Sequence, residues 1–403
     1  MSRATNRPTI LFLNVGHTFA HLFMLIFPTA VLALEGAWGM GYAELLPLGF
    51  AGYLLFGLGS LPAGWLGDRW SSGWMMALFF IGTGLSSILT GLASGPVGLA
   101  IGLTLIGIFA SIYHPVGIAW LVAASDRPGQ VLGINGVYGA AGVGGAALLT
   151  GLLADGFGWR AAFILPGLVC VAVGGGFVLS LLSGRIAMAR AEYQKRDGGV
   201  GAAAARRGLF LLFVSILFAG LIFQMSSVGM PKIFQDRLGS IIGEGAAAAG
   251  LLVSIVYAIS ALGQVAGGLL ADRFDERWLY ACSYGLQILL FALAAATFNP
   301  ALVALIAVAV SLQTGTQPVE NLLIAKYTPD SWRATVYGLK FVLALGLSAI
   351  GVPLLALIYG STGAFTGVFL VMAGFAVMPV LVGLMLPGRV PEPLQEPVIE
   401  PAE

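Results

Sequence analysis

The chain contains Gly64-Trp65-Leu66-Gly67-Asp68-Arg69 and, 204 positions later, Gly268-Leu269-Leu270-Ala271-Asp272-Arg273, each at the end of a long apolar run. The same register pairs Gly59 with Gly263, so the match extends beyond the six-residue motif. The repetition predicts that the chain consists of two copies of one unit.

Composition indicates the solvent in which these copies fold. Of the 403 residues, 58% are apolar and 9% are charged, and the mean hydropathy is +0.95. Such a chain suits lipid better than water. At about 20 residues per crossing, the apolar runs divide into twelve expected helices, which cover residues 9–34, 43–66, 74–93, 97–124, 130–154, 160–183, 208–231, 246–271, 277–297, 300–325, 334–359 and 364–386.

The expected fold is therefore all-α and integral to a membrane, with two pseudo-symmetric six-helix halves at residues 1–183 and 208–386. Internal duplication of this kind is common in secondary transporters, whose halves move around a central site. A linker at 184–207, rich in Ala, Gly and Arg, joins the halves. A tail at 387–403, rich in Pro and Glu, is expected to be disordered.

The basic residues predict the orientation. If twelve helices alternate in direction, most Lys and Arg residues fall on one side, and only Arg160, Lys232 and Arg237 fall on the other. We therefore expect a bacterial inner-membrane protein with both termini and the linker in the cytoplasm. The two cysteines, Cys170 and Cys282, lie in expected helices and are predicted to be ordinary buried thiols.

The duplicated pattern G-x-L-x-D-R resembles the cytoplasmic loop between helices 2 and 3 of the major facilitator superfamily, and its repeat between helices 8 and 9. With twelve helices and two halves, the resemblance covers essentially the whole chain and implies the major facilitator fold. It also implies that the two aspartates brace the closed cytoplasmic gate; the alternative is that they are simply charged loop residues. The gating motif residues are Gly64, Asp68, Arg69, Gly268, Asp272 and Arg273.

Polar residues within the expected helices indicate a pathway, because an ionisable side chain at the bilayer centre costs about 2.5 to 3.5 kcal/mol. Asn14, His17 and His21 share one face of the first helix, and Tyr113 and His114 precede a proline in the fourth. A register of 203 residues places His21 on Gln224 and His114 on Gln317. In the superfamily, the four helices that carry these residues line the central cavity. The alternative is that the histidines are structural.

The second half adds Gln313, Gln317 and Glu320 on one face of the tenth helix, and Lys340 in the eleventh. Glu320 and Lys340 have similar expected depths and are predicted to pair, although each could instead extend separately to the interface. An imidazole titrates near pH 6.5, so we expect His114, and to a lesser extent His21, to carry the proton-sensitive step, with Glu320 as the alternative. The residues expected to bind substrate or protons are Asn14, His17, His21, Tyr113, His114, Gln224, Gln313, Gln317, Glu320 and Lys340.

Within the superfamily, Gly16-His17 followed by Pro28, together with Tyr113-His114-Pro115, resembles the fosmidomycin-resistance branch, although His21 stands where that branch commonly has an acidic residue. The fifth helix is similar to the glycine-rich helix of drug-proton antiporters, without its proline; its glycines are Gly136, Gly139, Gly142, Gly144 and Gly145. The stretch from Asp155 to Arg160 resembles the superfamily's connector between helices 5 and 6. These resemblances imply proton-driven export of a small polar or amphipathic compound.

We therefore expect a transporter and not an enzyme, because the sequence has no HExxH, no GxSxG and no appended soluble domain. A symporter that imports a small metabolite is the nearest alternative. Metal-ion transport by the three histidines and a non-transporting membrane sensor are weaker alternatives. The expected partners are a small-molecule substrate, protons and the lipid bilayer. We expect no nucleic-acid partner, no cofactor, no bound metal and a monomeric chain.

Overall fold

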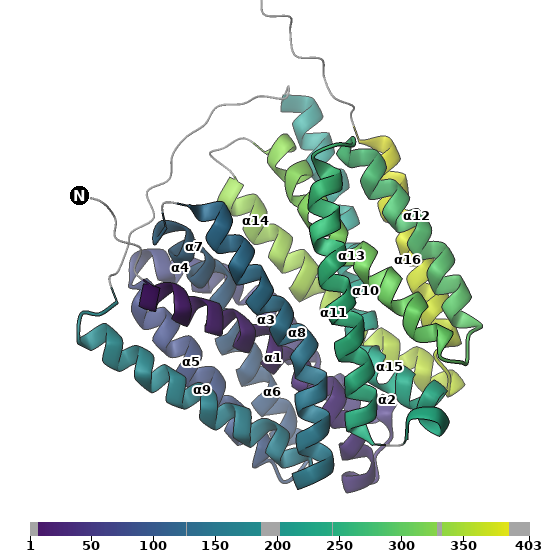
Figure 1. Ribbon diagram of the computed structural model, residues 1–403, viewed down its shortest axis with the longest axis horizontal. Helices are drawn as coiled ribbons and strands as arrows, with labels where there is room; N and C mark the ends of the chain where they lie inside the picture. Colours follow the sequence, from purple (N-terminus) through teal and green to yellow (C-terminus); the bar gives the residue numbers. More distant parts are fainter. Residues whose placement is uncertain (1–6, 126, 187–201, 244, 329–332, 387–403) are drawn as a thin grey trace, which may run out of the picture.

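The structure, a computed structural model, describes residues 7–125, 127–186, 202–243, 245–328 and 333–386 (Figure 1). These residues form helices and connecting turns, with no strand among them. The expected tail and most of the expected linker lie outside the described residues. Residues 202–207, which were expected in the linker, belong instead to the first turns of a long helix.

The first half begins with α1 (Arg7–Trp38) and ends with α9 (Trp159–Leu182). Between them lie α2 (Tyr42–Leu45), η1 (Leu46–Gly49), α3 (Phe50–Leu58), α4 (Ser60–Arg69), α5 (Ser72–Gly91), α6 (Pro96–Ala110), η2 (Tyr113–Gly117), α7 (Ile118–Ala123) and α8 (Pro128–Phe157). The second half comprises α10 (Ala202–Ile242), α11 (Ala246–Ala271), α12 (Glu276–Ala295), α13 (Ala301–Tyr327), α14 (Arg333–Phe341), η4 (Val342–Gly346), η5 (Leu347–Ile350), α15 (Gly351–Thr362) and α16 (Thr366–Met385).

Eleven helices in the described residues are long and apolar enough to cross a membrane, or up to twelve if one bent pair counts as a single span. The bent pair is Tyr42–Leu58 and Ser60–Arg69, which meet at an angle of 40°. It corresponds to the second expected helix, so the twelve expected crossings are found with one of them bent at Gly59. A multi-pass membrane protein with an all-α fold is therefore confirmed.

Two spans are irregular near their middles. The backbone of η2 makes a π-helical turn at Pro115, which has no N–H to donate to the preceding turn. The span that contains Lys340 changes from α14 to a π-helical turn in η4 and a 3-10 turn in η5. Irregular backbone inside a membrane protein usually lies where it is covered by protein or lines a cavity.

The seventh expected helix is longer than the sequence indicated. It was expected to end at Pro231, but α10 continues to Ile242. Arg237, which was expected in a loop, is buried in this extension and donates to the carbonyl oxygens of Ala294 and Thr297. These contacts anchor the extension. One thiol prediction was also wrong: Cys170 is buried, but Cys282 is exposed on α12.

The two halves meet most closely where α8 passes α11 (Figure 1). A Cβ atom added at Gly151 would lie 2.5 Å from the carbonyl oxygen of Ala246, and one added at Gly250 would lie 2.3 Å from that of Ala147. Backbones this close require glycine, as at small-residue contacts in membrane bundles. A second junction brings Gly57 of α3 against Gly346 of η4.

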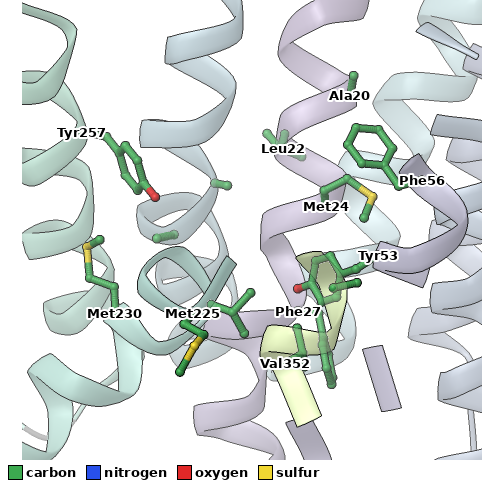
Figure 2. Close-up of a cluster of buried hydrophobic side chains, with 14 of the residues drawn as sticks. Ala20, Leu22, Met24, Phe27, Tyr53, Phe56, Met225, Met230, Tyr257 and Val352 are labelled. Carbon is green, nitrogen blue, oxygen red and sulfur yellow. The ribbon is translucent and has the colours of Figure 1, made fainter. Parts of the chain in front are cut away.

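Both motif copies lie at one end of the bundle, where α4 and α11 finish, and we call this the motif end. The opposite end is filled by buried apolar side chains from both halves (Figure 2). Phe27 of α1, Met230 of α10 and Val352 of α15 are at most 1% exposed. Their neighbours Met24 and Tyr53 line the central cavity, so this apolar cluster forms its closed floor.

Candidate functional site

A cavity of about 490 Å³ lies between the two halves. It is lined along α8 from Leu132 to Val143 and along α11 from Tyr257 to Gln264. These are the parts of both helices nearer to the motif end, so the cavity extends from the middle of the molecule toward that end. Its polar lining residues are His17, His21, Tyr53, His114, Asn135, Gln224, Ser227, Tyr257, Ser260, Gln264, Tyr284, Gln313, Thr314, Thr316, Gln317, Glu320, Asn321 and Lys340.

Three histidines form one cluster on the first-half wall. His17 and His21 are one turn apart on α1, and their Nε2 atoms are 3.1 Å apart. The ring of His114, on η2, packs edge-on against both, with centroid separations of 5.5 Å and 5.3 Å. Phe56 and Phe341 cover the other sides of His114. The sequence analysis expected the histidines to line a central cavity, and this geometry is consistent with that expectation; that the three rings form one cluster was not predicted.

Next to this cluster lies Asn135 of α8, which the sequence analysis did not single out. Its backbone carbonyl accepts a hydrogen bond from Nδ1 of His17 at 2.8 Å. Its side-chain amide donates to Oδ1 of Asn14 at 2.9 Å and to the hydroxyl of Tyr113 at 2.8 Å. Asn135 is only 2% exposed, so these hydrogen bonds form inside the bundle. The only signal in the sequence was an amide side chain one position before the first glycine of the fifth-helix stripe.

Two of the residues expected to bind substrate or protons lie away from the cavity surface. Asn14 and Tyr113 are buried behind the histidines and are not among the lining residues of the cavity. Tyr113 donates to the backbone carbonyl of Leu13 at 2.8 Å, and its ring stacks on His17 at 5.0 Å. Both residues hold the wall in place and do not face the cavity.

Glu320 and Lys340 form the ion pair expected from the sequence, with 2.7 Å between Oε1 and Nζ. Both are buried, at 6% and 5% exposed, which contradicts the alternative that each extends separately to the interface. Lys340 also donates to Oδ1 of Asn321 at 2.7 Å, and the hydroxyl of Tyr280 donates to Oε2 of Glu320 at 3.3 Å. Each charged group therefore has a polar partner in addition to the ion pair, which offsets part of the cost of burying the charges.

The three glutamines that the sequence predicted also line the cavity. Gln313 donates to the carbonyl oxygen of Ala219 at 3.3 Å. The amide nitrogen of Gln224 is buried and has no hydrogen-bond partner in the described residues. Because a buried donor without a partner is costly, Gln224 differs in this respect from Gln313. Gln317 is more exposed to the cavity.

The fifth-helix glycines have a specific packing role. A Cβ at Gly139 would lie 2.6 Å from the ring of His17, and one at Gly142 would lie 2.4 Å from the carbonyl oxygen of Thr18. Gly144 faces Tyr257 of the other half, whereas Gly136 and Gly145 have open space beside them. The stripe thus lets α8 approach α1 closely enough to fix the histidine cluster.

The end opposite the motifs is held closed by polar contacts between the halves. Glu35 of α1 pairs with Lys232 of α10 at 2.7 Å. Asp155, at the end of α8, accepts hydrogen bonds from the backbone N–H groups of Ala246 and Ala247 at 3.1 Å and 2.8 Å. Its carboxylate therefore caps the N-terminus of α11 in the other half. The sequence analysis missed these contacts, although it correctly identified the connector that contains Asp155.

The motif end lacks equivalent contacts. Asp68, Arg69, Asp272 and Arg273 are exposed. Arg69 stacks on Trp65 of its own helix, at 4.3 Å. Within the described part of the chain, no hydrogen bond or ion pair joins the four charged motif residues to the opposite half. Gly64 has a packing role, because a Cβ there would lie 3.1 Å from Pro115; Gly268 has open space beside it.

Comparison with known proteins finds relatives among transporters. The puromycin resistance protein pur8 of Streptomyces alboniger is 35% identical over 116 residues, which are 28% of this chain and 22% of that protein. A probable hexose phosphate transport protein of Chlamydia pneumoniae is 28% identical over 165 residues, which are 40% of this chain and 36% of that protein. The chain thus matches about a fifth of the length of the first relative and about a third of the second.

Solved structures share the fold over nearly the whole chain. A bacterial homologue of the human lysosomal transporter Spinster, in an inward-facing and occupied conformation, aligns with a TM-score of 0.75 and 15% identity, over 95% of this chain and 96% of that one. The sequence pattern of the Major Facilitator Superfamily matches residues 13–240 and again residues 212–402. The chain therefore belongs to the Major Facilitator Superfamily, and the duplication seen in its sequence is the two-fold repeat of that family.

Proposed function

We propose that this protein exports a small polar or amphipathic organic compound in exchange for protons, by alternating access. The observation that carries the proposal is the central cavity, which is lined by both halves and closed at one end by the Glu35–Lys232 pair and the Asp155 cap. Relative movement of the halves would break these contacts and close the motif end. The resemblance to the fosmidomycin-resistance branch and the match to a puromycin resistance protein support export.

The cavity lining supports the proposed cargo class. Its volume is within the range of about 300 to 1,000 Å³ that is usual for small-molecule sites. Aliphatic and aromatic side chains such as Leu132, Val143 and Phe223 alternate with the amides of Gln224 and Gln317. Such a surface binds a compound with both apolar and hydrogen-bonding parts.

We place the proton-coupling step at Glu320. The sequence alone favoured His114, but Glu320 is the one carboxylate among the described lining residues, and its charge is balanced by Lys340. Tyr280 and Tyr284 of α12 are the other titratable groups next to it. Protonation of Glu320 would weaken its attraction to Lys340 and free the ammonium group for cargo. Cargo that prefers one protonation state must, by linkage, shift the proton equilibrium equally.

We further propose that the motif end faces the cytoplasm of a bacterial cell, with the linker and both termini on that side. The distribution of basic residues supports this orientation. In that orientation the structure corresponds to an inward-facing state. Labelling of a single cysteine introduced in the linker tests it in intact cells; reaction with an impermeant reagent from outside would contradict the topology.

The test of function is a transport assay in proteoliposomes under an imposed pH gradient, with candidate compounds screened for proton-driven counterflow. We expect the parent protein to move its cargo against the proton flux and Glu320→Gln to lose the response to the gradient while still exchanging cargo. A response that survives in Glu320→Gln would move the coupling step to another residue.

Import by proton symport is the second candidate. It is supported by the match to probable hexose phosphate transport proteins. The same assay separates the two functions, because a symporter moves cargo and protons in the same direction.

A further inference from the structure

His17, His21 and His114 bring three imidazole rings together at the cavity wall, and each ring can offer one nitrogen to a metal ion. The nearest ligand atoms of His17, His21 and His114 all lie within 4.8 Å of one another. All three side chains line the cavity, so a small ion can reach them from the motif end. From this arrangement we infer that the cluster is a binding site for a divalent transition-metal ion of the Zn²⁺, Co²⁺ or Ni²⁺ class.

The spacing of the two α1 histidines fits such an ion. Two nitrogens that each lie about 2.0 to 2.1 Å from a tetrahedral zinc ion are about 3.3 to 3.4 Å apart. The Nε2 atoms of His17 and His21 are already 3.1 Å apart. The i,i+4 spacing on a helix places both rings on one face, and a ligand nitrogen of His114 lies within 4.8 Å of theirs, so a small shift of its ring would bring it to the same ion.

The protonation pattern of His17 also fits. Its Nδ1 donates to the carbonyl oxygen of Asn135, which leaves the lone pair of the neutral ring on Nε2, where it accepts a hydrogen bond from Nε2 of His21; a metal ion would take the place of the shared proton. Metal-binding histidines commonly donate their second ring nitrogen to a backbone carbonyl in this way. Asn135 is itself held by Asn14 and Tyr113, so the acceptor is fixed before an ion arrives.

The surroundings of the His114 ring support a metal site independently. Its side chain is 7% exposed, and its ring makes no hydrogen bond to the described part of the chain. Its described neighbours are aromatic or imidazole rings: those of His17, His21, Tyr113, Phe56 and Phe341. Its ring nitrogens therefore have no described protein partner beside the cavity, and a metal ion shared with His17 and His21 would supply one.

The donor set determines which ions fit. Imidazole nitrogen suits zinc, copper, nickel and iron, whereas magnesium and calcium prefer oxygen ligands. Three protein nitrogens leave a fourth tetrahedral position, which opens toward the cavity. A water molecule, or an oxygen or nitrogen donor of the cargo, would occupy it. The inference concerns equilibrium binding and holds for either direction of transport.

The test uses the full-length protein in lipid nanodiscs, without a polyhistidine tag. Isothermal titration with Zn²⁺, and visible absorption with Co²⁺ as a spectroscopic probe, should show one bound ion per chain and the strong absorption bands of tetrahedral cobalt. His17→Gln, His21→Gln and His114→Gln should each weaken binding by about 100-fold or more, since even loss of a supporting hydrogen bond typically costs 10- to 100-fold. Mg²⁺ should not compete.

The matched control is Cys282→Ser, which removes the exposed thiol that could hold the same ions at the surface. It should leave stoichiometry and affinity unchanged. Size-exclusion profiles and melting temperatures confirm that the histidine variants are folded. Absence of saturable binding in the parent, or full affinity in any two of the three histidine variants, overturns the inference. Because the readout is binding, its failure would leave the proteoliposome test of transport unaffected.

Discussion

Glu35 of α1 and Lys232 of α10 form an ion pair across the two halves, with 2.7 Å between Oε2 and Nζ. Lys232 also lies 3.3 Å from Asp236 of its own helix, so its ammonium group is shared between two carboxylates. The pair is partly shielded from solvent: the side chain of Lys232 is 11% exposed and that of Glu35 is 24% exposed. It lies at the closed end, where separation of the halves would have to break it.

We expect Glu35→Gln to open this end more often. A partly exposed ion pair contributes about 0.2 to 1 kcal/mol, so the open population should rise up to about fivefold. The open population is measured in a protein that carries Val352→Cys and Cys282→Ser, as the rate at which an impermeant thiol reagent labels the cysteine at position 352. Glu44→Gln is the matched control, because it removes an exposed acidic charge at the same end. Equal labelling rates in the two variants would show that the pair does not hold the end closed.

The Asp155 cap gives a second, independent prediction. Its two carboxylate oxygens accept from two consecutive N–H groups at the start of α11. Loss of a helix N-terminal acceptor typically costs about 0.5 to 2 kcal/mol. Asp155→Ala should therefore increase Val352→Cys labelling, and combination with Glu35→Gln should increase it further. A double variant that labels no faster than the parent would contradict the role of both contacts.

The Glu320–Lys340 pair is suited to a double-mutant cycle. Removal of one partner leaves a buried charge, which typically costs about 3 to 5 kcal/mol, whereas removal of both can be far milder. We expect Glu320→Gln and Lys340→Met each to lower the melting temperature, and the double variant to recover much of the loss. Thermal unfolding in nanodiscs measures this. Strictly additive losses would show that the two side chains act independently.

The register found in the sequence recurs as packing within each half. Gly59 and Gly263 correspond at 204 residues, as do Ser111 and Gly315, and both pairs are helix contacts. A Cβ at Gly59 would lie 2.6 Å from Oγ of Ser111, and the carbonyl oxygen of Gly263 lies 2.8 Å from a Cβ at Gly315. A contact that each half makes internally is thus visible as a sequence repeat.

Contacts between the halves are different, because no repeat encodes them. The Glu35–Lys232 pair and the Asp155 cap depend on the relative position of two units, which local sequence patterns do not specify. The prediction that the seventh helix ends at Pro231 was wrong for a related reason. Proline usually ends a helix, but in a membrane bundle neighbouring groups can compensate for the lost hydrogen bond. The cluster of three histidines needed tertiary structure to bring η2 against α1.

Asp275 gives a prediction about pH at the motif end. Hydrogen bonds from Arg277 hold the pKa of the Asp275 carboxyl below its usual range, and its side chain caps α12 by accepting from the backbone N–H of Arg277 at 3.0 Å. Because the folded-state pKa is lowered, the stabilisation is complete above the unfolded pKa of about 3.9 and is lost as the pH falls through the lowered value.

Asp275→Asn should therefore lower stability at neutral pH by about 0.2 to 1 kcal/mol, because the amide can still cap the helix but loses the charge that pairs with Arg277. The difference from the parent protein should disappear at acidic pH, below the folded-state pKa. Melting temperatures in nanodiscs at a series of pH values check both parts. A difference that persists unchanged in acid would show that the carboxylate charge contributes nothing.

The last prediction concerns Asp68, which is exposed here and which family resemblance assigns to the closed gate at the motif end. If it braces that gate, its hydrogen bonds form only when the halves close there, and each charge-assisted bond contributes about 1.5 to 3 kcal/mol. Asp68→Asn would then destabilise the state that is absent from this structure and leave the present one intact. Transport in proteoliposomes should fall about tenfold or more, since about 1.4 kcal/mol corresponds to a factor of ten, while equilibrium binding of cargo from the motif end is retained. A parallel loss of binding and melting temperature would instead show that Asp68 supports the fold, and unchanged transport would remove it from the gate.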